Sequence, residues 1–297
     1  MNIKGKFFDL YKKNLKRFSK GMGLGKIYPI KKILKSTKEF LKPEYCEVQG
    51  HKMYLDKYDS LDLSINGVYG VLETEIIKNE VKEGDIVLDL GANIGYYTLL
   101  LARQVGKTGK VFAFEPEPSN FEILTMNVKE NNYKNITIVQ KAVSNVHKRI
   151  TLWVGQRSSG ANRIYEPKIT NTQDFKTIEV DCIKLDDYFK ETDLINKICF
   201  IKMDIEGAEY KTLLGMQSIL HSNPDLIILT EYARTSLEDA NDDPEQFLKL
   251  FEDEGFRIYL LDEEILKIVP LDKEKFLQSK TEDKTINLLC KKIRDNN

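Results

Sequence analysis

The sequence has no long hydrophobic run, only four cysteines and almost no net charge. No stretch approaches the roughly 18–20 apolar residues that a membrane-spanning helix needs. Charged residues interrupt the first positions so often that we expect no signal peptide there. The cysteines lie far apart without a C-x-x-C pair, which argues against a zinc or disulfide framework. They indicate reduced thiols in a cytoplasmic protein.

The near-zero net charge hides two regions of opposite charge. Residues 1–43 carry 13 basic and two acidic side chains, whereas the other 254 residues carry 32 basic and 44 acidic ones. Ile3, Phe7, Tyr11, Leu15 and Phe18 recur at intervals of three or four positions, which predicts an amphipathic helix over 3–20 with these residues as its apolar stripe. We therefore expect a basic helical arm at 1–43 and a larger α/β domain at 44–297.

Three interpretations of the basic arm stay open. It could be a helical cap that packs on the larger domain or on a second copy in a homodimer. It could lie at the inner membrane surface, where each lysine near anionic lipid contributes about 1 kcal/mol. Contact with nucleic acid is the weakest interpretation, because the arm has 12 lysines and one arginine and thus lacks forked donors.

From residue 84 onward, strand and helix patterns alternate. Short apolar runs predict strands at 85–91, 110–115, 136–143, 197–204, 225–232, 256–262 and 285–292. Amphipathic patterns predict helices at 95–104, 118–131, 207–220 and 244–254, and a strand pair is expected at 149–155 and 176–183. Apolar strands separated by helices are typical of a parallel sheet that is covered on both faces.

A glycine-containing turn, Asp89-Leu90-Gly91-Ala92-Asn93-Ile94-Gly95, follows the first of these strands. We expect Gly91 to allow a tight turn where backbone N–H groups approach a ligand, and Gly95 to let the helix pack on the strand. Asn93 stands where a dinucleotide fingerprint has its second glycine. The carboxylate of Asp89 would repel a pyrophosphate but suits the sulfonium and ammonium groups of S-adenosylmethionine.

The second strand ends in Glu115, 26 positions after Asp89. An acidic residue at this distance is placed to accept hydrogen bonds from a ribose hydroxyl. Together, Asp89, Glu115 and the glycines predict an adenosyl-binding site.

Several blocks resemble the FkbM family of methyltransferases, in this order: "VLDLGANIGYYTLLLAR", "GKVFAFEPEPSNFEIL", "KAVS" and "FIKMDIEGAEYKTLLGM". The resemblance implies a class I fold with a seven-stranded Rossmann-like sheet whose last strand is antiparallel. It also implies S-adenosylmethionine as cofactor and, usually, methylation of a hydroxyl oxygen on a sugar, glycan or other small molecule. Glu73 matches a family block before the first strand. The cofactor-binding residues that we expect are Asp89, Gly91, Ala92, Asn93, Gly95, Glu115, Ala142, Ser144, Asp204 and Glu73.

Carboxylates also follow the fourth and fifth strands, in "KMDIEGAEY" and "ILTEY". Asp204 should face the methionine end of the cofactor, Glu206 should lie toward the substrate, and Glu231 should reach the same sheet edge. Transfer of a methyl group to oxygen is helped by a base, for which Asp204 and Glu231 are candidates, with Glu206 beside them. The carboxylates could instead hold a divalent cation, but no His or Asn cluster accompanies them, so we expect no metal.

Two rival functions remain at this point. The first is a nicotinamide-dependent oxidoreductase, which is disfavoured because the middle glycine of the dinucleotide fingerprint is missing. The second is a non-catalytic module that binds a membrane or nucleic acid and retains only a vestigial cofactor pocket. Nucleobase methylation is demoted, since Asp-Ile-Glu-Gly stands where a Pro-Pro-aromatic segment would hold a flipped base. Asn162, Arg163 and Tyr165 could contact the substrate or belong to a flexible polar lid.

Overall fold

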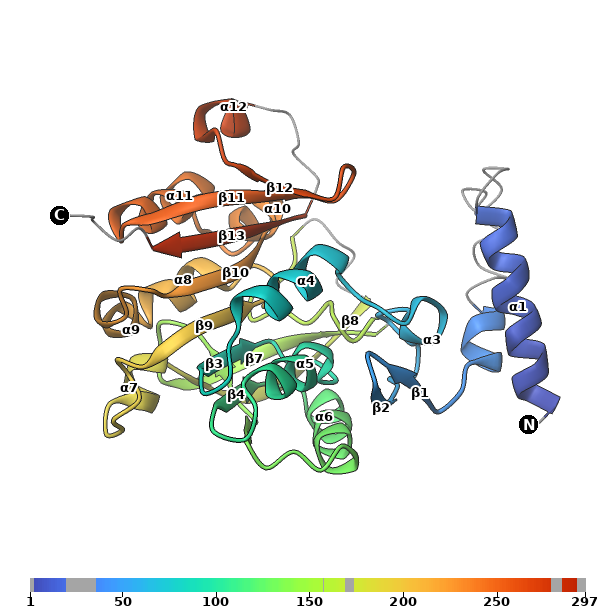
Figure 1. Ribbon diagram of the computed structural model, residues 1–297. Coiled ribbons are helices and arrows are strands. Elements are labelled where there is room, and N and C mark those ends of the chain that lie inside the picture. The colour runs from blue at the N-terminus through green and yellow to red at the C-terminus, as the bar shows by residue number, and fades with distance from the viewer. Residues whose placement is uncertain (1–2, 20–35, 157, 169–173, 279–284, 293–297) are drawn as a thin grey trace. The chain divides into compact units, whose positions relative to one another are not determined.

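The computed structural model describes residues 3–19, 36–156, 158–168, 174–278 and 285–292 (Figure 1). The chain forms two compact units, Met1–Tyr69 and Gly70–Asn297. The expected division at residues 43/44 stays a prediction. The sequence also predicts that the glycine run at 21–25 ends the first arm helix and that Pro29 begins a second one, and both positions lie outside the described residues.

The first unit contains α1 (Ile3–Ser19), the antiparallel hairpin of β1 (Tyr45–Val48) and β2 (His51–Tyr54), and α3 (Leu63–Asn66). The helix predicted at 3–20 is thus present. Its buried side differs from the predicted stripe, since Phe8 is buried and stacks on Tyr11, whereas Phe7 is exposed. None of the helices in the described ranges is both long and apolar enough to cross a bilayer.

The second unit is built on one large sheet. Its strands lie in the order β12, β11, β13, β10, β9, β3, β4, β5, and Figure 1 shows those from β11 to β4 side by side. Their bounds are β3 (Ile86–Leu90), β4 (Lys110–Phe114), β5 (Ile136–Val139), β9 (Ile198–Met203), β10 (Ile227–Tyr232), β11 (Phe256–Asp262), β12 (Lys267–Pro270) and β13 (Ile286–Lys292).

The sheet has the predicted class I arrangement. The pairs among β5, β4, β3, β9 and β10 are parallel, and the last strand, β13, runs antiparallel between β10 and β11. An eighth strand that was not predicted, β12, forms an antiparallel hairpin with β11 at the edge. The expected fold class, a Rossmann-like α/β domain, is confirmed.

Alternating side chains of β3 show why both faces of the sheet are covered. Leu88 and Leu90 belong to a large core that includes apolar residues of the helices on one face. Val87 and Asp89 point to the other face, where the α5 residue Thr98 contacts Asp89. The first face carries α7 (Leu185–Phe189), α8 (Glu209–Leu214), α9 (Gln217–Ser222), α10 (Arg234–Asp239) and α11 (Pro244–Asp253). The second carries α5 (Tyr96–Gln104) and α6 (Pro118–Glu130), with α4 (Val71–Glu80) against α5, while α12 (Lys273–Gln278) follows β12.

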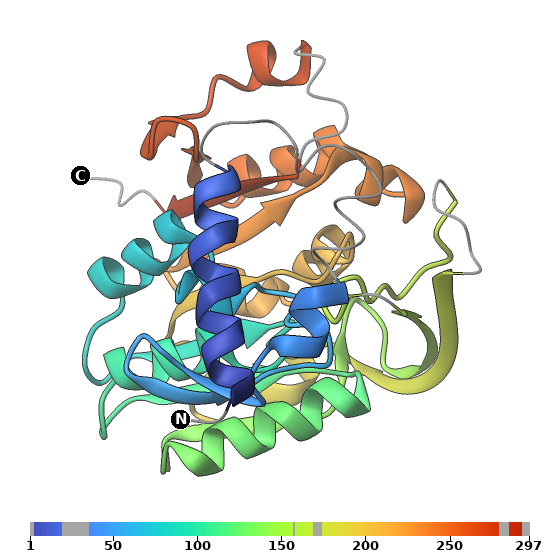
Figure 2. The same ribbon diagram turned by 90° about the vertical axis from the view of Figure 1, so that its right-hand side faces the viewer.

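Two predicted elements are divided in the structure. The strand expected at 136–143 leaves the main sheet after Val139, and β6 (Ala142–Val143) joins a separate sheet with β8 (Phe175–Ile183) and β7 (Lys148–Gly155). Figure 2 shows β8 as a long curved ribbon in yellow-green. The helix expected at 207–220 is broken at Gly215, where a Cβ atom would lie 2.2 Å from the carbonyl oxygen of Ser144.

Candidate active site

The turn between β3 and α5 is held by its own backbone amides. The N–H groups of Gly91 and Ala92 donate to the carbonyl oxygen of Phe114, over 3.0 and 2.9 Å. The N–H of Asn93 donates to Glu115 Oε2 over 2.8 Å. These three amides are therefore not directed at a ligand, which corrects the expectation that the turn offers N–H groups.

Gly91 is required for a different reason. Its φ is +80°, and a Cβ atom would lie 1.9 Å from the carbonyl oxygen of Asp204. A side chain at Gly91 would thus collide with the chain that leaves β9. The turn and the acidic block are consequently in direct contact.

Two buried carboxylates flank the turn. Asp89 accepts a hydrogen bond from Thr98 Oγ1 over 2.5 Å, and burial raises its pKa to about 6. Glu115 accepts hydrogen bonds from the backbone N–H groups of Asn93 and Glu117, and burial raises its pKa to about 7. Both residues lie where the sequence predicted them, at the carboxyl ends of neighbouring parallel strands.

This set of groups fits S-adenosylmethionine. A pyrophosphate needs free N–H donors at such a turn, but the amides of Gly91, Ala92 and Asn93 are already used. Hydroxyl and ammonium groups need acceptors, and Asn93 Oδ1 is a buried acceptor without a hydrogen-bond partner among the described residues. Glu115 would hold the ribose, while Asp89 and Asp204 would face the cationic end of the cofactor.

Other predicted cofactor residues have mainly structural surroundings. A Cβ at Gly95 would lie 2.7 Å from Leu124 Cδ1, so Gly95 makes room for α6 and not, as expected, for a strand. Ala92 packs with Leu124, whereas Ala142 belongs to the core of the small sheet. Ser144 is buried and its N–H donates to the carbonyl oxygen of Ile183. That Ala142 and Ser144 border the adenine stays a prediction.

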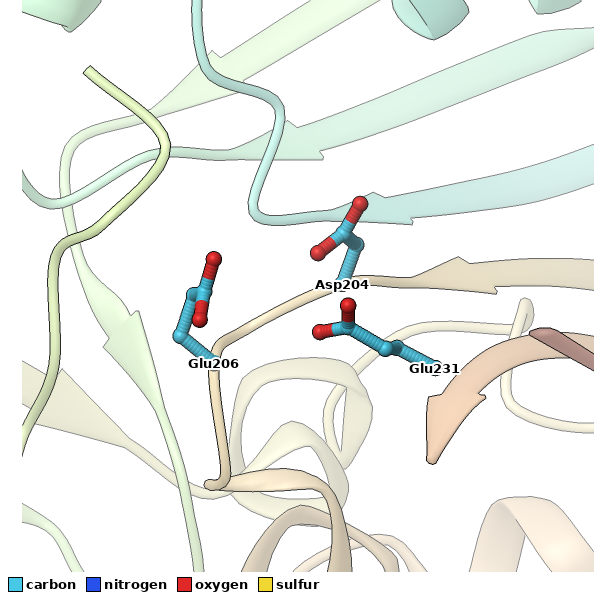
Figure 3. Close-up of side chains that lie close together, drawn as sticks. All are labelled: Asp204, Glu206 and Glu231. Atoms are coloured by element: carbon cyan, nitrogen blue, oxygen red, sulfur yellow. The ribbon is translucent and has the colours of Figure 1, made fainter. Parts of the chain in front are cut away.

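Three carboxylates converge at the carboxyl ends of β9 and β10. Asp204, Glu206 and Glu231 each place an oxygen within 4.8 Å of the others, and Figure 3 shows the three side chains close together, with Glu231 extending toward Asp204. Glu206 has a φ of +53°, an uncommon conformation for a residue with a side chain. The structure thus brings together the three predicted catalytic residues.

The close approach of like charges changes how protons are held. Burial, followed by repulsion from Asp204, raises the pKa of Glu206 to about 8. The same two causes raise the pKa of Glu231 well above its usual value. Glu206 is therefore mostly protonated at neutral pH, and Glu231 holds a proton more readily than an exposed carboxyl group does. Glu209 lies close by, and burial raises its pKa to about 7.

Lys202 supplies the nearest positive charge to this group. It is 1% exposed, its Nζ lies 3.3 Å from Asp204 Oδ2, and it stands 5.0 Å above the ring of Tyr97. Although burial alone would lower the pKa of Lys202, Asp204, Glu73, Glu231 and Asp89 raise it. Lys202 is a buried counter-ion for Asp204.

Glu73 joins the site through a residue that the sequence did not point to. Its Oε1 accepts a hydrogen bond from Asn287 Nδ2 over 2.6 Å, and its Oε2 is buried without a partner in the described part of the chain. Asn287 stands opposite Glu231 in the β10–β13 register. The pair is 214 positions apart, so no local pattern could have revealed it.

The three carboxylates have the spacing to hold a hard divalent cation through oxygen ligands. However, Lys202 already lies beside Asp204. The predicted absence of a metal stays a prediction.

Residues 89–258 match the family described as the methyltransferase FkbM domain, which covers more than half of the chain. Methyltransferase 1 of Beauveria bassiana is 24% identical over 170 residues, covering 49% of this chain and 68% of that protein. Hexuronic acid methyltransferase AglP of Haloferax volcanii is 30% identical over 152 residues, covering 50% of this chain and 56% of that protein.

A solved structure of a SAM-dependent O-methyltransferase from Thermotoga maritima aligns over 88% of this chain and 83% of its own, with 16% identity and a TM-score of 0.43. The matched family range contains the glycine turn, Glu115 and the three carboxylates. The chain belongs to the FkbM family of S-adenosylmethionine-dependent methyltransferases.

Proposed function

We propose that the protein methylates a hydroxyl oxygen on a sugar, a glycan or another hydroxylated small molecule. The observation that carries this proposal is the convergence of Asp204, Glu206 and Glu231 at the sheet edge that adjoins the cofactor turn. A hydroxyl must lose its proton during transfer, and this group of carboxylates is placed to take it.

The mechanism assigns each carboxylate a state. Bound S-adenosylmethionine supplies an electrophilic methyl group. Asp204 takes the proton of the acceptor hydroxyl. The oxygen of that hydroxyl receives the methyl group, which leaves the sulfur of the cofactor. Burial and repulsion from Asp204 raise the pKa values of Glu206 and Glu231, which favours their protonated forms, and these donate hydrogen bonds that orient the acceptor. Lys202 stabilises the negative charge of Asp204 before transfer.

The relative AglP supports a sugar as the acceptor, since it is named as a hexuronic acid methyltransferase. The nicotinamide oxidoreductase is the weaker alternative, because the N–H groups of Gly91, Ala92 and Asn93 already donate to acceptors within the protein and are not available to a pyrophosphate. Calorimetry with S-adenosylmethionine and with NAD separates the two functions. Binding of NAD alone would contradict the assignment.

A methyl-transfer screen tests the acceptor class. Radiolabelled S-adenosylmethionine is incubated with sugar nucleotides, simple sugars and cell-envelope extracts, and each product is analysed for an O-methyl ether. We expect Asp204→Asn to lower kcat roughly 10²- to 10⁴-fold, the range for removal of a general base, and Glu231→Gln, which keeps a neutral hydrogen-bond donor, to lower kcat much less. Calorimetry with S-adenosylhomocysteine must show that both variants still bind. Methyl groups found only on nitrogen would overturn the proposal.

A further inference from the structure

The segment after β7 carries an arginine that the mechanism above does not use. Arg163 is tied to Trp153 of β7 by two backbone hydrogen bonds, of 2.9 and 2.8 Å. Asn162 Oδ1 also accepts a hydrogen bond from the N–H of Gly155 over 3.2 Å. The backbone at Arg163 is therefore held in place on the small sheet.

The same segment runs from the cofactor turn to the acidic block. The carbonyl oxygen of Ser159 accepts a hydrogen bond from Asn120 Nδ2 over 3.0 Å, and a Cβ at Gly160 would lie 3.6 Å from Asn93 Nδ2. Further along, the hydroxyl of Tyr165 lies 2.5 Å from where a Cβ of Gly207 would be. Residues 158–165 thus form one wall beside the reaction centre, with Arg163 between its two ends.

The guanidinium of Arg163 has few hydrogen-bond or ion-pair partners in the described part of the chain. The side chain is 17% exposed, its Cζ stands 5.9 Å from the centre of the Phe175 ring, and Nη2 lies 4.0 Å from Glu206 Oε2. Its Nε is buried and lacks a hydrogen-bond partner within the described ranges. A guanidinium has five N–H donors in a fixed fork, which matches a carboxylate or a phosphate.

Glu206 is a weak counter-ion for this group. A separation of 4.0 Å is longer than a hydrogen bond. Burial and repulsion from Asp204 raise the pKa of Glu206 to about 8, so it is mostly uncharged at neutral pH. A largely buried cation without an anion is costly, and a ligand that brings an anion would remove that cost.

We propose that Arg163 binds an oxyanionic substituent, a carboxylate or a phosphate, of the methyl acceptor. The inference rests on the proposed O-methylation and narrows its substrate class to acidic sugars or similar acidic polyols. Glu206 lies near both the proposed anion-binding residue and the catalytic carboxylates, since it is close to Arg163 and also to Asp204 and Glu231. The anionic group would therefore be held near the hydroxyl that loses its proton.

Two other roles for Arg163 are physically open. It could merely screen Glu206, in which case no acceptor would sense it. It could instead hold the carboxylate of the cofactor, in which case its loss would weaken cofactor binding. The experiment must distinguish acceptor binding from both.

Calorimetry on the full chain saturated with S-adenosylhomocysteine does this with three probes that differ at one carbon: D-glucuronate, glucose 6-phosphate and D-glucose. We expect at least one anionic sugar to bind about 10-fold or more tightly than glucose, as a charge-assisted hydrogen bond provides. The preferred anion tells a carboxylate site from a phosphate site. Arg163→Met should weaken that binding roughly 10- to 100-fold, with Arg163→Lys in between. Glucose binding should not change.

Arg149→Met is the matched control, because Arg149 lies on the same small sheet with a 70% exposed side chain. It should leave all three affinities unchanged. The inference is overturned if neither anionic sugar binds better than glucose, or if Arg163→Met leaves their affinities unchanged. Weaker binding of S-adenosylhomocysteine to Arg163→Met would assign the residue to the cofactor and also overturn it. Failure of the proposed function would appear separately, as a lack of O-methyl products in the acceptor screen.

Discussion

At the scale of single residues, Lys202 supplies the buried positive charge that balances the carboxylates of the site. It is buried beside Asp204, with Glu73, Asp89 and Glu231 acting on it from neighbouring elements. Removing one partner of a buried ion pair leaves an uncompensated charge, so Lys202→Met should lower the free energy of unfolding by about 3–5 kcal/mol. Chemical denaturation at neutral pH measures this loss.

A second lysine provides the control for Lys202. Lys197 pairs with Asp193 over 2.8 Å at the surface, where its side chain is 51% exposed. Lys197→Met should change stability by less than about 1 kcal/mol, as for exposed ion pairs. The double variant Lys202→Met/Asp204→Asn should recover part of the lost stability but not the activity. Equal effects of the two single lysine variants would contradict a buried counter-ion role.

Glu206 makes stability depend on pH. Its pKa is raised from 4.5 to about 8, so the folded protein holds the proton more tightly than the unfolded chain does. The contribution of Glu206 to stability should therefore be greatest at low pH, fall as pH rises from about 4.5 to about 8, and be absent above that. One such group contributes at most about 1.4 kcal/mol per pH unit, and less here because the side chain is 29% exposed.

Glu206→Gln removes the contribution of this one carboxyl to the pH dependence. The gain in thermal stability of the variant over the wild type should grow between pH 5 and about pH 8, and then level off. Glu122→Gln, at an exposed position of α6, is the matched control for the change of Glu to Gln. A stability difference between Glu206→Gln and the wild type that does not change with pH would contradict a raised pKa of Glu206.

The three carboxylates also allow a direct test for a metal. We expect dialysis against EDTA to leave methyl transfer unchanged, because the ammonium of Lys202, 3.3 Å from Asp204 Oδ2, disfavours a dication at the same carboxylate. The measurement is the initial rate before and after chelation. If chelation abolished activity and Mg²⁺ or Mn²⁺ restored it, the mechanism would be metal-assisted and Asp204 would not act as a free base.

At the scale of elements, the contact between the glycine turn and the end of β9 can be tested with two alanine variants. Gly91 and Gly255 have similar φ values, +80° and +77°, but only at Gly91 would a Cβ collide, 1.9 Å from the Asp204 carbonyl oxygen. At Gly255 nothing lies within 4 Å. Gly255→Ala should cost about 1–2 kcal/mol of stability for the left-handed conformation alone.

Gly91→Ala should cost clearly more, and it should also weaken binding of S-adenosylmethionine, because Asp204 and Asn93 would shift. Denaturation curves and cofactor calorimetry on both variants measure the two effects. If Gly91→Ala were no worse than Gly255→Ala in either measurement, the packing of the turn against β9 would be wrong.

The elements that the sequence predicted well are those whose pattern is local. The strands β3, β4, β9 and β10 are apolar runs of five or six residues, and each falls within its predicted range. The break at Gly215 was missed because the contact that requires a glycine there, with the carbonyl oxygen of Ser144, is remote in sequence. The exit of the chain after Val139 was missed for a similar reason, since β6 pairs with β8, about 40 positions away.

The site shows the same limit. Asp89, Glu115, Asp204 and Glu231 could be predicted because each ends a strand of a parallel sheet, where ligands bind. The partners that set their charge could not, since Asn287 reaches Glu73 only through strand pairing. Nor could the amides of the glycine turn be assigned from the motif, because their acceptors lie on β4 and just after it.

At the scale of the whole molecule, the charge asymmetry stays the feature without an assigned role. Residues 1–43 carry 13 basic side chains against two acidic ones. In α1, Phe7 is 57% and Leu10 is 55% exposed, and Lys6 and Lys13 are exposed beside them. Exposed apolar side chains among lysines suit the surface of an anionic bilayer, where the acyl boundary takes the apolar groups. A cap on a second copy of the chain is the alternative.

Vesicle co-sedimentation of the full chain separates these roles. We expect binding to phosphatidylserine vesicles but not to phosphatidylcholine vesicles, and its loss at about 1 M salt, where the Debye length is only ~3 Å. Lys6→Glu/Lys13→Glu should weaken binding roughly 30-fold or more, since each lysine contributes about 1 kcal/mol. Lys107→Glu/Lys129→Glu makes the same charge change at exposed positions of the second unit and should have little effect. Absence of vesicle binding, with a dimer in solution that Phe7→Ser/Leu10→Ser dissociates, would assign the arm to a contact between copies instead.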